Sequence, residues 1–303
     1  MARNLPASVK QQLLNLSRAR GWDFNLLLVR YANERLLYRI SQSPYADRLV
    51  LKGAFLFIYW EGTTHRPTRD IDLLGYGIED VTAMTQAFCD ICQTRVVDDG
   101  LRFDADSIRV TPIQEGQTQH GYRVQIIAYL GKGRIPVQVD VGAGDVVTPG
   151  PETIEFPTLL DAFPAPRLKA YPQEVTIAEK THAMIDKGLK NSRMKDFYDL
   201  WALSQRFAFD GLRLTAALRN TFAAKGMSVP ESILPLSSAF AADEEKRKQW
   251  RTFITRDELD APTWSKLIPL LRDFLEPPLQ AVRKDELFDA GWEPGGPWRM
   301  KMP

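Results

Sequence analysis

Two aspartates flank one isoleucine in the run DIDLL, residues 70–74. Its polar and apolar residues alternate as in a strand, where side chains two apart point to the same face. The carboxylates of Asp70 and Asp72 should therefore converge, while Ile71 and Leu73 face the core. Like charges this close repel each other unless each meets a cation or bulk water, and a divalent metal ion is one such cation. The alternative is a solvated strand end that only protects a sheet edge from aggregation.

A third carboxylate lies in a later strand-like run. In PVQVDV, residues 136–141, three valines share one face and leave Gln138 and Asp140 on the other. If this run pairs with residues 70–74, three carboxylates surround one point. Such an oxygen-ligand set suits Mg²⁺ and the two-metal sites of phosphoryl transfer. Asp145, in a glycine-rich turn, is a looser candidate.

Gly53 separates a short apolar run from a predicted helix that ends near Trp60. A residue without a side chain at a helix start lets a phosphate approach main-chain N–H groups, and the helix dipole favours the anion. Lys52 and Thr68 are nearby in the sequence. Taken alone, the Lys-Gly pair is better explained by a tight strand-to-helix turn, and only the acids favour the phosphate interpretation.

A second polar group lies between residues 172 and 203. Pro172 begins a predicted helix that holds Lys180 well inside it, and the following helix carries Asp196 and Asp199 on one face. Two alternatives stay open. Lys180 can be a core lysine paired with an acid, and an acid near a helix start can simply stabilise the helix dipole.

The whole chain has a net charge of only +1, so any contact with nucleic acid needs a local basic patch. Two groups of cations qualify, and Trp250 beside the second could stack on a base. The first group comprises Lys187, Lys190, Arg193 and Lys195, and the second Lys246, Arg247, Lys248 and Arg251. No apolar run reaches the roughly 20 residues of a membrane span, and the first residues lack the features of a signal peptide. We therefore expect a cytoplasmic protein with no membrane partner.

The periodicity of the sequence predicts an α+β fold in unlike parts. Apolar residues repeat at three and four positions in residues 6–43, which predicts two helices. A helix over residues 81–96 carries Cys89 and Cys92, whose expected state is partly buried, reduced thiols rather than a redox or zinc pair. Three strand-like runs follow, and the turn GKGR closes a hairpin between the last two. Residues 142–172, rich in proline and glycine, are expected to be a connection, with helices from there to about residue 283.

These patterns divide the 303 residues, of which 44% are hydrophobic and 25% charged, into two lobes and a tail. Residues 1–150 should hold the N-terminal helices and the sheet. Residues 151–290 should form a helical lobe that completes the site and binds the acceptor. Residues 291–303 show no periodicity and are expected to be an extended or mobile tail.

Five segments in one order resemble the nucleotidyltransferase AbiEii/AbiGii toxin family, which includes MenT-like toxins. The family belongs to the DNA polymerase β-like nucleotidyltransferase superfamily. The segments are LVLKGAFLF, RPTRDIDLL, VQVDV, IAEKTHAM and RMKDFYDLW, within residues 49–203. The set is far more specific than any one member. The resemblance implies a polymerase β-like lobe with a mixed or antiparallel sheet, followed by a mostly helical C-terminal lobe.

The resemblance also implies roles for individual residues. Asp70 and Asp72 correspond to the metal-binding pair, and Asp140 looks like the third carboxylate. The catalytic set further includes Lys180, expected on the triphosphate, and Asp196, the acid of the last motif. The implied nucleotide-binding residues are Gly53, Ala54, Thr68, Arg69, Lys180 and Arg193. Ala54 departs from the family pattern, because many members have serine there and this chain lacks that hydroxyl.

The implied enzyme is a toxin of a toxin–antitoxin system that transfers a nucleoside monophosphate from a nucleoside triphosphate to an acceptor. The leading acceptor is the 3′ end of tRNA, which would block translation, and the expected protein partner is a cognate antitoxin. The three carboxylates would hold two Mg²⁺ ions, or Mn²⁺, and Asp140 is expected to accept the proton of the attacking hydroxyl. Two alternatives stay open: transfer to a protein or small molecule, and a catalytically silent scaffold that binds nucleotide.

Overall fold

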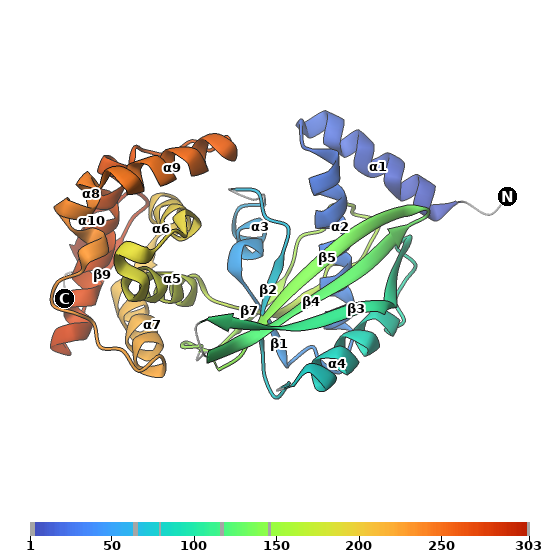
Figure 1. Ribbon diagram of the computed structural model, residues 1–303, viewed down its shortest axis with the longest axis horizontal. Helices are drawn as coiled ribbons and strands as arrows, with labels where there is room; N and C mark the ends of the chain where they lie inside the picture. Colours follow the sequence, from blue (N-terminus) through green and yellow to red (C-terminus); the bar gives the residue numbers. More distant parts are fainter. Residues whose placement is uncertain (1–3, 63–65, 79, 116–117, 145–146, 302–303) are drawn as a thin grey trace. The chain divides into compact units, whose positions relative to one another are not determined.

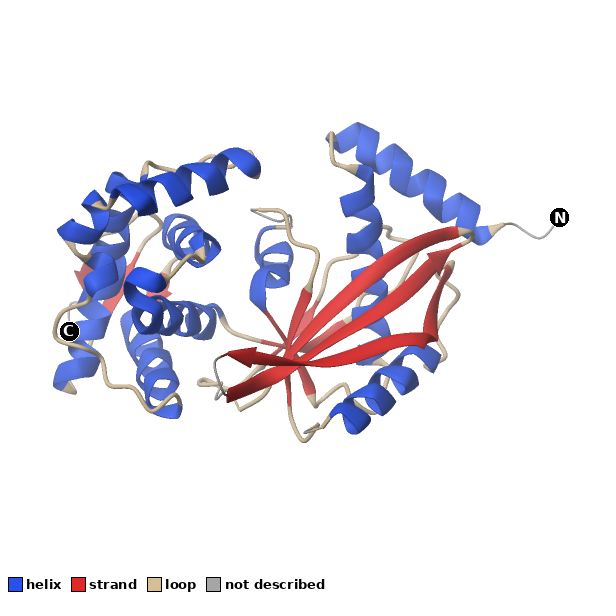
Figure 2. Cartoon of the chain, in the orientation of Figure 1, coloured by secondary structure: helices blue, strands red, loops and turns tan. Residues whose placement is uncertain are grey.

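A computed structural model describes residues 4–62, 66–78, 80–115, 118–144 and 147–301. The chain forms two compact units, Met1–Gly144 with Glu152–Ala170, and Asp145–Pro151 with Tyr171–Pro303. The composition predicts a boundary at residue 150, whereas residues 152–170 belong to the first unit. Strands gather in the first unit and helices dominate the second (Figure 2). Within the described ranges, no helix is long and apolar enough to cross a lipid bilayer.

The first unit combines helices with one seven-stranded sheet (Figure 1). Its helices are α1 (Leu5–Arg20), α2 (Phe24–Ser41), the 3-10 turn η1 (Gly53–Phe55), α3 (Leu56–Glu61) and α4 (Val81–Gln93). Its strands are β1 (Leu49–Lys52), β2 (Ile71–Gly75), β3 (Leu101–Glu115), β4 (Thr118–Leu130), β5 (Gly133–Gly142), β6 (Glu152–Glu155) and β7 (Arg167–Ala170). The two opening helices, the strand after Asp70 and the helix of the cysteines are therefore confirmed.

The sheet order is β3-β4-β5-β2-β1-β7-β6. Strands β4 and β5 form the predicted antiparallel hairpin, joined by the turn at residues 131–132. β5 then pairs in parallel with β2, and β2 pairs antiparallel with β1. The mixed sheet confirms the predicted α+β class, and it places the run that contains Asp140 directly beside the run that begins at Ile71.

Helices cover one face of this sheet. α2 contacts β5 and β7, α4 contacts β3 and β4, and the two helices contact each other (Figure 1). Along β5, Val137, Val139 and Val141 are buried, whereas the residues between them are only half-buried or exposed. Because side chains alternate along a strand, Asp140 lies on the face opposite the valines. The acids are therefore on the face of the sheet that α2 and α4 leave uncovered.

The segment between residues 142 and 172 contains more structure than a connection. It supplies β6 and β7, which pair with each other, and β7 also pairs in parallel with β1 at Leu51 and Ala170. Each strand has four residues, too few to show a clear alternation among the prolines around them. The predicted start of the second lobe is therefore displaced by about twenty residues of sequence.

The second unit is mostly helical. Its helices are α5 (Gln173–Lys187), α6 (Met194–Arg206), α7 (Gly211–Ala224), α8 (Ser238–Ala242), α9 (Glu244–Arg256) and α10 (Trp264–Lys284), with 3-10 turns η2 (Gly188–Lys190) and η3 (Leu234–Leu236). A small sheet joins β8 (Phe209–Asp210), β9 (Ala290–Trp292) and β10 (Trp298–Met300). Aromatic rings of α6, α8, α9 and α10 pack together around Trp264 to form its core.

The C-terminal tail is part of this fold as far as Met300. The Trp292 side chain is buried and donates from Nε1 to the Ser204 carbonyl oxygen at 2.7 Å. Trp298 Nε1 donates to the Phe274 carbonyl oxygen at 2.8 Å, and its ring stacks on that of Phe274. Isolated aromatic residues fix this hairpin, so a search for periodicity gives no sign of it. The interpretation of residues 291–303 as a separate tail is wrong for the described part.

Candidate active site

Asp72 and Asp140 lie side by side on neighbouring strands. The parallel register of β2 and β5 pairs their Cα atoms directly, and paired residues direct their side chains to the same face. Asp70 precedes β2 by one residue and is exposed, and Asp72 is half-buried. The predicted meeting of the two runs is therefore present in the sheet, with Asp72 and Asp140 as its centre.

Gly53 crowds against Asp72. Its φ of +75° lies in the left-handed region, and a Cβ at this position would come within 2.7 Å of Asp72 Cβ and Cγ and closer still to Oδ2. Only glycine leaves room for the carboxylate here. The neighbouring Ala54 is a buried residue, 4% exposed. The predicted contact of Gly53 and Ala54 with nucleotide phosphate stays a prediction.

We expect Gly53→Ala to disturb the position of Asp72 as well as the backbone. Gly62→Ala is the matched control, since Gly62 has a φ of +76° and nothing within 4 Å of its ideal Cβ. Both variants should lose about 1 kcal/mol of unfolding free energy from the left-handed backbone. Gly53→Ala should lose a further 1–3 kcal/mol, or lose nucleotide transfer at least tenfold, because the carboxylate must move. Denaturant titration and transfer assays showing identical behaviour of the two variants would refute the crowding.

The segment before Asp70 is tied to α2. Asn33, a fully buried residue of that helix, donates from Nδ2 to the Arg69 carbonyl oxygen at 2.8 Å. This bond fixes the main chain directly before the acidic pair. The Thr68 side chain is half-buried and Arg69 is exposed. Their predicted nucleotide contacts stay predictions. Sequence reasoning missed Asn33, because the pattern of α2 marks it only as part of an apolar helix.

Arg123 is hydrogen-bonded to the third carboxylate, Asp140. From β4, its Nε donates to Asp140 Oδ1 at 2.8 Å and its Nη2 donates to Oδ2 at 2.7 Å. This hydrogen-bonded pairing raises the pKa of Arg123 above its usual value, and the charges of Asp70 and Asp72 add to the effect. Arg123 was missed because only the β4–β5 register, which no local pattern specifies, brings it opposite Asp140.

Asp70, Asp72 and Asp140 suit a divalent cation by ligand type but not by their present arrangement. All their donor atoms are carboxylate oxygens, the ligand type that Mg²⁺ prefers, and Gly53 leaves the room that the Asp72 carboxylate occupies. Among the residues that the structure describes, no group of three or more His, Cys, Asp or Glu side chains is gathered as a metal cluster. A divalent cation would therefore have to gather the side chains of Asp70, Asp72 and Asp140, and Asp140 must first leave Arg123. Asp145 lies outside the described residues.

The second unit holds its own charge network around Lys180 on α5. The Lys180 Nζ lies 3.0 Å from Asp196 Oδ1 and 2.7 Å from Asp199 Oδ2. Both carboxylates are completely buried, and Arg193 Nε lies 2.7 Å from Asp196 Oδ2. The interpretation of Lys180 as a lysine paired with an acid is therefore confirmed, and Asp199 joins the pair. The predicted contact of Lys180 with triphosphate stays a prediction.

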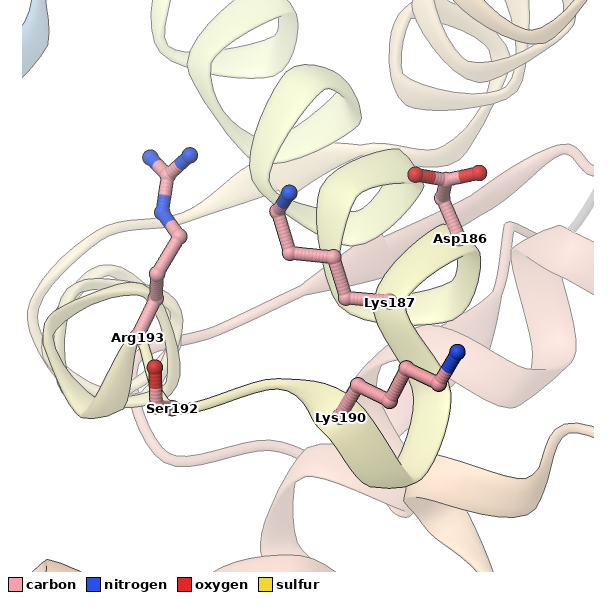
Figure 3. Close-up of a pocket in the computed structure, with 5 residues that line it drawn as sticks. All are labelled: Asp186, Lys187, Lys190, Ser192 and Arg193. Atoms are coloured by element: carbon pink, nitrogen blue, oxygen red, sulfur yellow. The ribbon is translucent and has the colours of Figure 1, made fainter. Parts of the chain in front are cut away.

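A pocket of about 390 Å³ lies on the second unit near the end of α5. It is lined by Asp186, Lys187, Lys190, Ser192 and Arg193 (Figure 3). Lys187 and Lys190 favour an anion here, and Arg193 adds a third cation that is also paired with Asp196 at 2.7 Å. The alternative is that the lysines only complement the C-terminal dipole of α5. Three of the four cations in the first predicted group therefore line one pocket.

The second basic group does not form the predicted surface. Lys246 is buried and donates from Nζ to the Asn191 carbonyl oxygen at 2.8 Å. Trp250 is 1% exposed and donates from Nε1 to the Pro262 carbonyl oxygen at 2.9 Å, so it cannot stack on a base. The prediction for these two residues is wrong, because both lie on the inner side of α9. Lys248 and Arg251 remain exposed.

The two cysteines show no sign of redox or metal chemistry within the described chain. Both are free and half-buried on α4. Burial raises the pKa of Cys92 to about 12, and the same effect raises the pKa of Cys89. A thiol with a raised pKa is a poor nucleophile and a poor metal ligand at neutral pH. The predicted partial burial of the two thiols is confirmed.

Comparison with known proteins identifies the family of this chain. The model of the nucleotidyl transferase AbiEii toxin of type IV toxin–antitoxin systems matches residues 35–278. No curated protein matched the sequence. Two solved structures are similar to this chain, each at 16% sequence identity. A candidate nucleotidyltransferase from H. pylori has a TM-score of 0.44, and the match covers 84% of this chain and 96% of that one. JHP933 from Helicobacter pylori has a TM-score of 0.43, and the match covers 84% of this chain and 93% of that one. Since the family model spans most of the chain, including every acid described above, this protein belongs to the AbiEii nucleotidyltransferase toxin family.

Proposed function

We propose that this toxin transfers a nucleoside monophosphate from a nucleoside triphosphate to the 3′ end of tRNA in a Mg²⁺-dependent reaction, and that a cognate antitoxin counteracts it. The observation that carries the proposal is the pairing of Asp72 with Asp140 on neighbouring strands, with Gly53 making room for the Asp72 carboxylate. Family membership supports a nucleotide substrate and an antitoxin partner. Metal dependence and the RNA acceptor rest on the chemistry of the residues present.

The chain's own residues suit this transfer. The acceptor hydroxyl oxygen forms a bond to the α-phosphorus, the bond from that phosphorus to the bridging oxygen breaks, and pyrophosphate leaves. Bound Mg²⁺ would supply charge that stabilises the leaving group and acidifies the hydroxyl. Asp70 and Asp72 would hold that charge in place. Asp140, once released from Arg123, is the carboxylate best placed on this face to accept the hydroxyl proton.

The pocket of the second unit supports RNA as the acceptor. Lys187, Lys190 and Arg193, the last of which is also paired with Asp196, line a space large enough for a phosphate group. With a net charge of +1, the protein has no general attraction for RNA, so binding must rest on such a local group. Lys195, exposed on α6, extends the same basic segment.

We expect the triple substitution of Lys187, Lys190 and Lys195 by glutamate to reduce tRNA labelling by at least tenfold and to leave nucleotide binding unchanged. Each lost phosphate contact should also reduce the slope of log affinity against log salt by about one unit. The matched control reverses Lys225, Lys266 and Lys284, exposed lysines of the same unit that do not line the pocket. Labelling and salt slopes that respond equally to both triple variants would show a net-charge effect and place the acceptor contact elsewhere.

The acceptor itself is identified by incubating the protein with each α-labelled nucleoside triphosphate, Mg²⁺ and a cell extract. We expect label from one or more nucleotides in the tRNA band of a denaturing gel. Treatment with ribonuclease should remove that band, and treatment with protease should not. Label that resists ribonuclease would instead identify a protein or small-molecule acceptor, and the absence of any label would favour the silent scaffold.

A further inference from the structure

A row of charges crosses four neighbouring strands on the face that carries the acids. The β-sheet register pairs Lys52 with Asp72, Asp72 with Asp140, and Asp140 with Arg123. Residues paired in this way share one face of a sheet. Two carboxylates thus lie between two cations, in the order Lys52, Asp72, Asp140, Arg123. The acids of the site are therefore held in a charge-compensated arrangement built into the sheet.

The outer contact of this row is the ion pair of Arg123 with Asp140. Arg123 engages both oxygens of Asp140, at 2.8 and 2.7 Å, in the bidentate geometry that makes Arg–carboxylate pairs strong. The Arg123 side chain is 44% exposed and that of Asp140 is 21% exposed.

A carboxylate whose two oxygens both accept hydrogen bonds from a guanidinium is a poor ligand for a metal ion and a poor acceptor of a hydroxyl proton. The partial exposure of Arg123 means that its long side chain can move into solvent without leaving a buried charge unpaired. A planar guanidinium that leaves a carboxylate has a second partner of matching geometry in a phosphate group. Arg123 is therefore suited to exchange its carboxylate partner, Asp140, for a phosphate group.

We propose that Arg123 is a positioning residue. In the free protein it keeps the Asp140 carboxylate hydrogen-bonded, and it releases that carboxylate when a nucleotide phosphate replaces Asp140 beside the guanidinium. The inference rests on the proposed function, because it assigns Asp140 to the metal-dependent site. Arg123 lowers the affinity of the free protein for divalent metal, since a cation must leave before Asp140 can serve as a ligand. The third carboxylate thereby becomes usable only after the nucleotide has bound.

The test is titration of the full chain with Mn²⁺, without nucleotide, followed by electron paramagnetic resonance of the free ion. Arg123→Gln should bind Mn²⁺ about fivefold more tightly than the unchanged protein, the upper range for a pair that is partly exposed to solvent. In the Asp140→Asn background, Arg123→Gln should change the affinity less than twofold, because the carboxylate that Arg123 holds by two hydrogen bonds is already gone. Arg102→Gln, which removes a strand arginine 3.8 Å from Asp104 in the same sheet, should have no effect.

A second titration in the presence of a non-hydrolysable nucleoside triphosphate checks the exchange. The difference between Arg123→Gln and the unchanged protein should then disappear, and the variant should bind the nucleotide more weakly. Arg123→Lys, which keeps the charge and loses the fork, should lie between the two. Thermal melting of each variant shows that it is folded before the titration.

The outcomes separate this inference from the proposed function. In one outcome, Asp70→Asn and Asp72→Asn weaken Mn²⁺ binding, but Arg123→Gln binds Mn²⁺ no more tightly than the unchanged protein. The proposal that Arg123 withholds Asp140 is then overturned, and the metal site stands. If Asp70→Asn and Asp72→Asn leave Mn²⁺ binding unchanged, the metal site is wrong, and the inference is overturned with it.

Discussion

Asp72→Ala and Asp70→Ala are expected to abolish nucleotide transfer, by at least about 10³-fold, while the protein stays folded. Asp72 lies opposite Asp140 on the face of the sheet that α2 and α4 leave uncovered, so removing its half-buried carboxylate creates no cavity in the core. Transfer is measured with labelled nucleoside triphosphate, and folding by thermal melting in the absence of metal. The melting temperature should change only slightly.

Asp104→Ala is the matched control for both variants. Asp104 lies on β3 of the same sheet and also has an arginine, Arg102, within 4 Å. Its removal should leave transfer unchanged. Full activity in either Asp70→Ala or Asp72→Ala would show that the acidic pair does not bind the reacting nucleotide, whatever the resemblance implies.

Lys180→Met should have the largest effect on stability, a loss of about 3–5 kcal/mol of unfolding free energy. The substitution leaves two completely buried carboxylates, Asp196 and Asp199, without the ammonium that both contact. Lys195→Met, one residue before Asp196 but exposed, should change the unfolding free energy by less than about 0.5 kcal/mol. Urea denaturation measures both variants.

Adding Asp199→Asn to Lys180→Met should restore part of the lost stability, because one buried charge is removed. The predicted contact with triphosphate is tested in the same variants by nucleotide binding under conditions where they remain folded. A variant that is folded and stable yet no longer binds nucleotide would assign Lys180 to the substrate. A variant that unfolds easily but binds nucleotide normally would leave Lys180 with the structural role alone.

Local patterns predicted the elements that carry the site. Alternation in residues 70–74 and 136–141 predicted β2 and β5, and the turn GKGR predicted the hairpin that ends in Asp140. These signals are local, because side-chain period and turn chemistry depend on a few adjacent residues. The pairing of β2 with β5 was then a reasonable inference from the carboxylates themselves, and the sheet order confirms it.

The features that sequence reasoning missed all depend on long-range contacts. Arg123 acquires its role only through the β4–β5 register, and Asn33 only because α2 packs beside the segment before Asp70. Lys246 and Trp250 look like a basic, aromatic surface in sequence, yet the packing of α9 turns both inward. The strands β6 and β7 are too short for alternation to be recognised, so the boundary of the first unit was displaced.

The most direct test of the account compares α-labelled with γ-labelled nucleoside triphosphate on purified tRNA in the presence of Mg²⁺. We predict that label from the α position enters the RNA with release of pyrophosphate, that label from the γ position does not, and that Asp72→Ala transfers neither. Transfer of the γ label would identify a kinase reaction. Transfer of the α label by Asp72→Ala, or into protein instead of RNA, would contradict the assignment of this chain as a tRNA nucleotidyltransferase that uses the acidic face of its sheet.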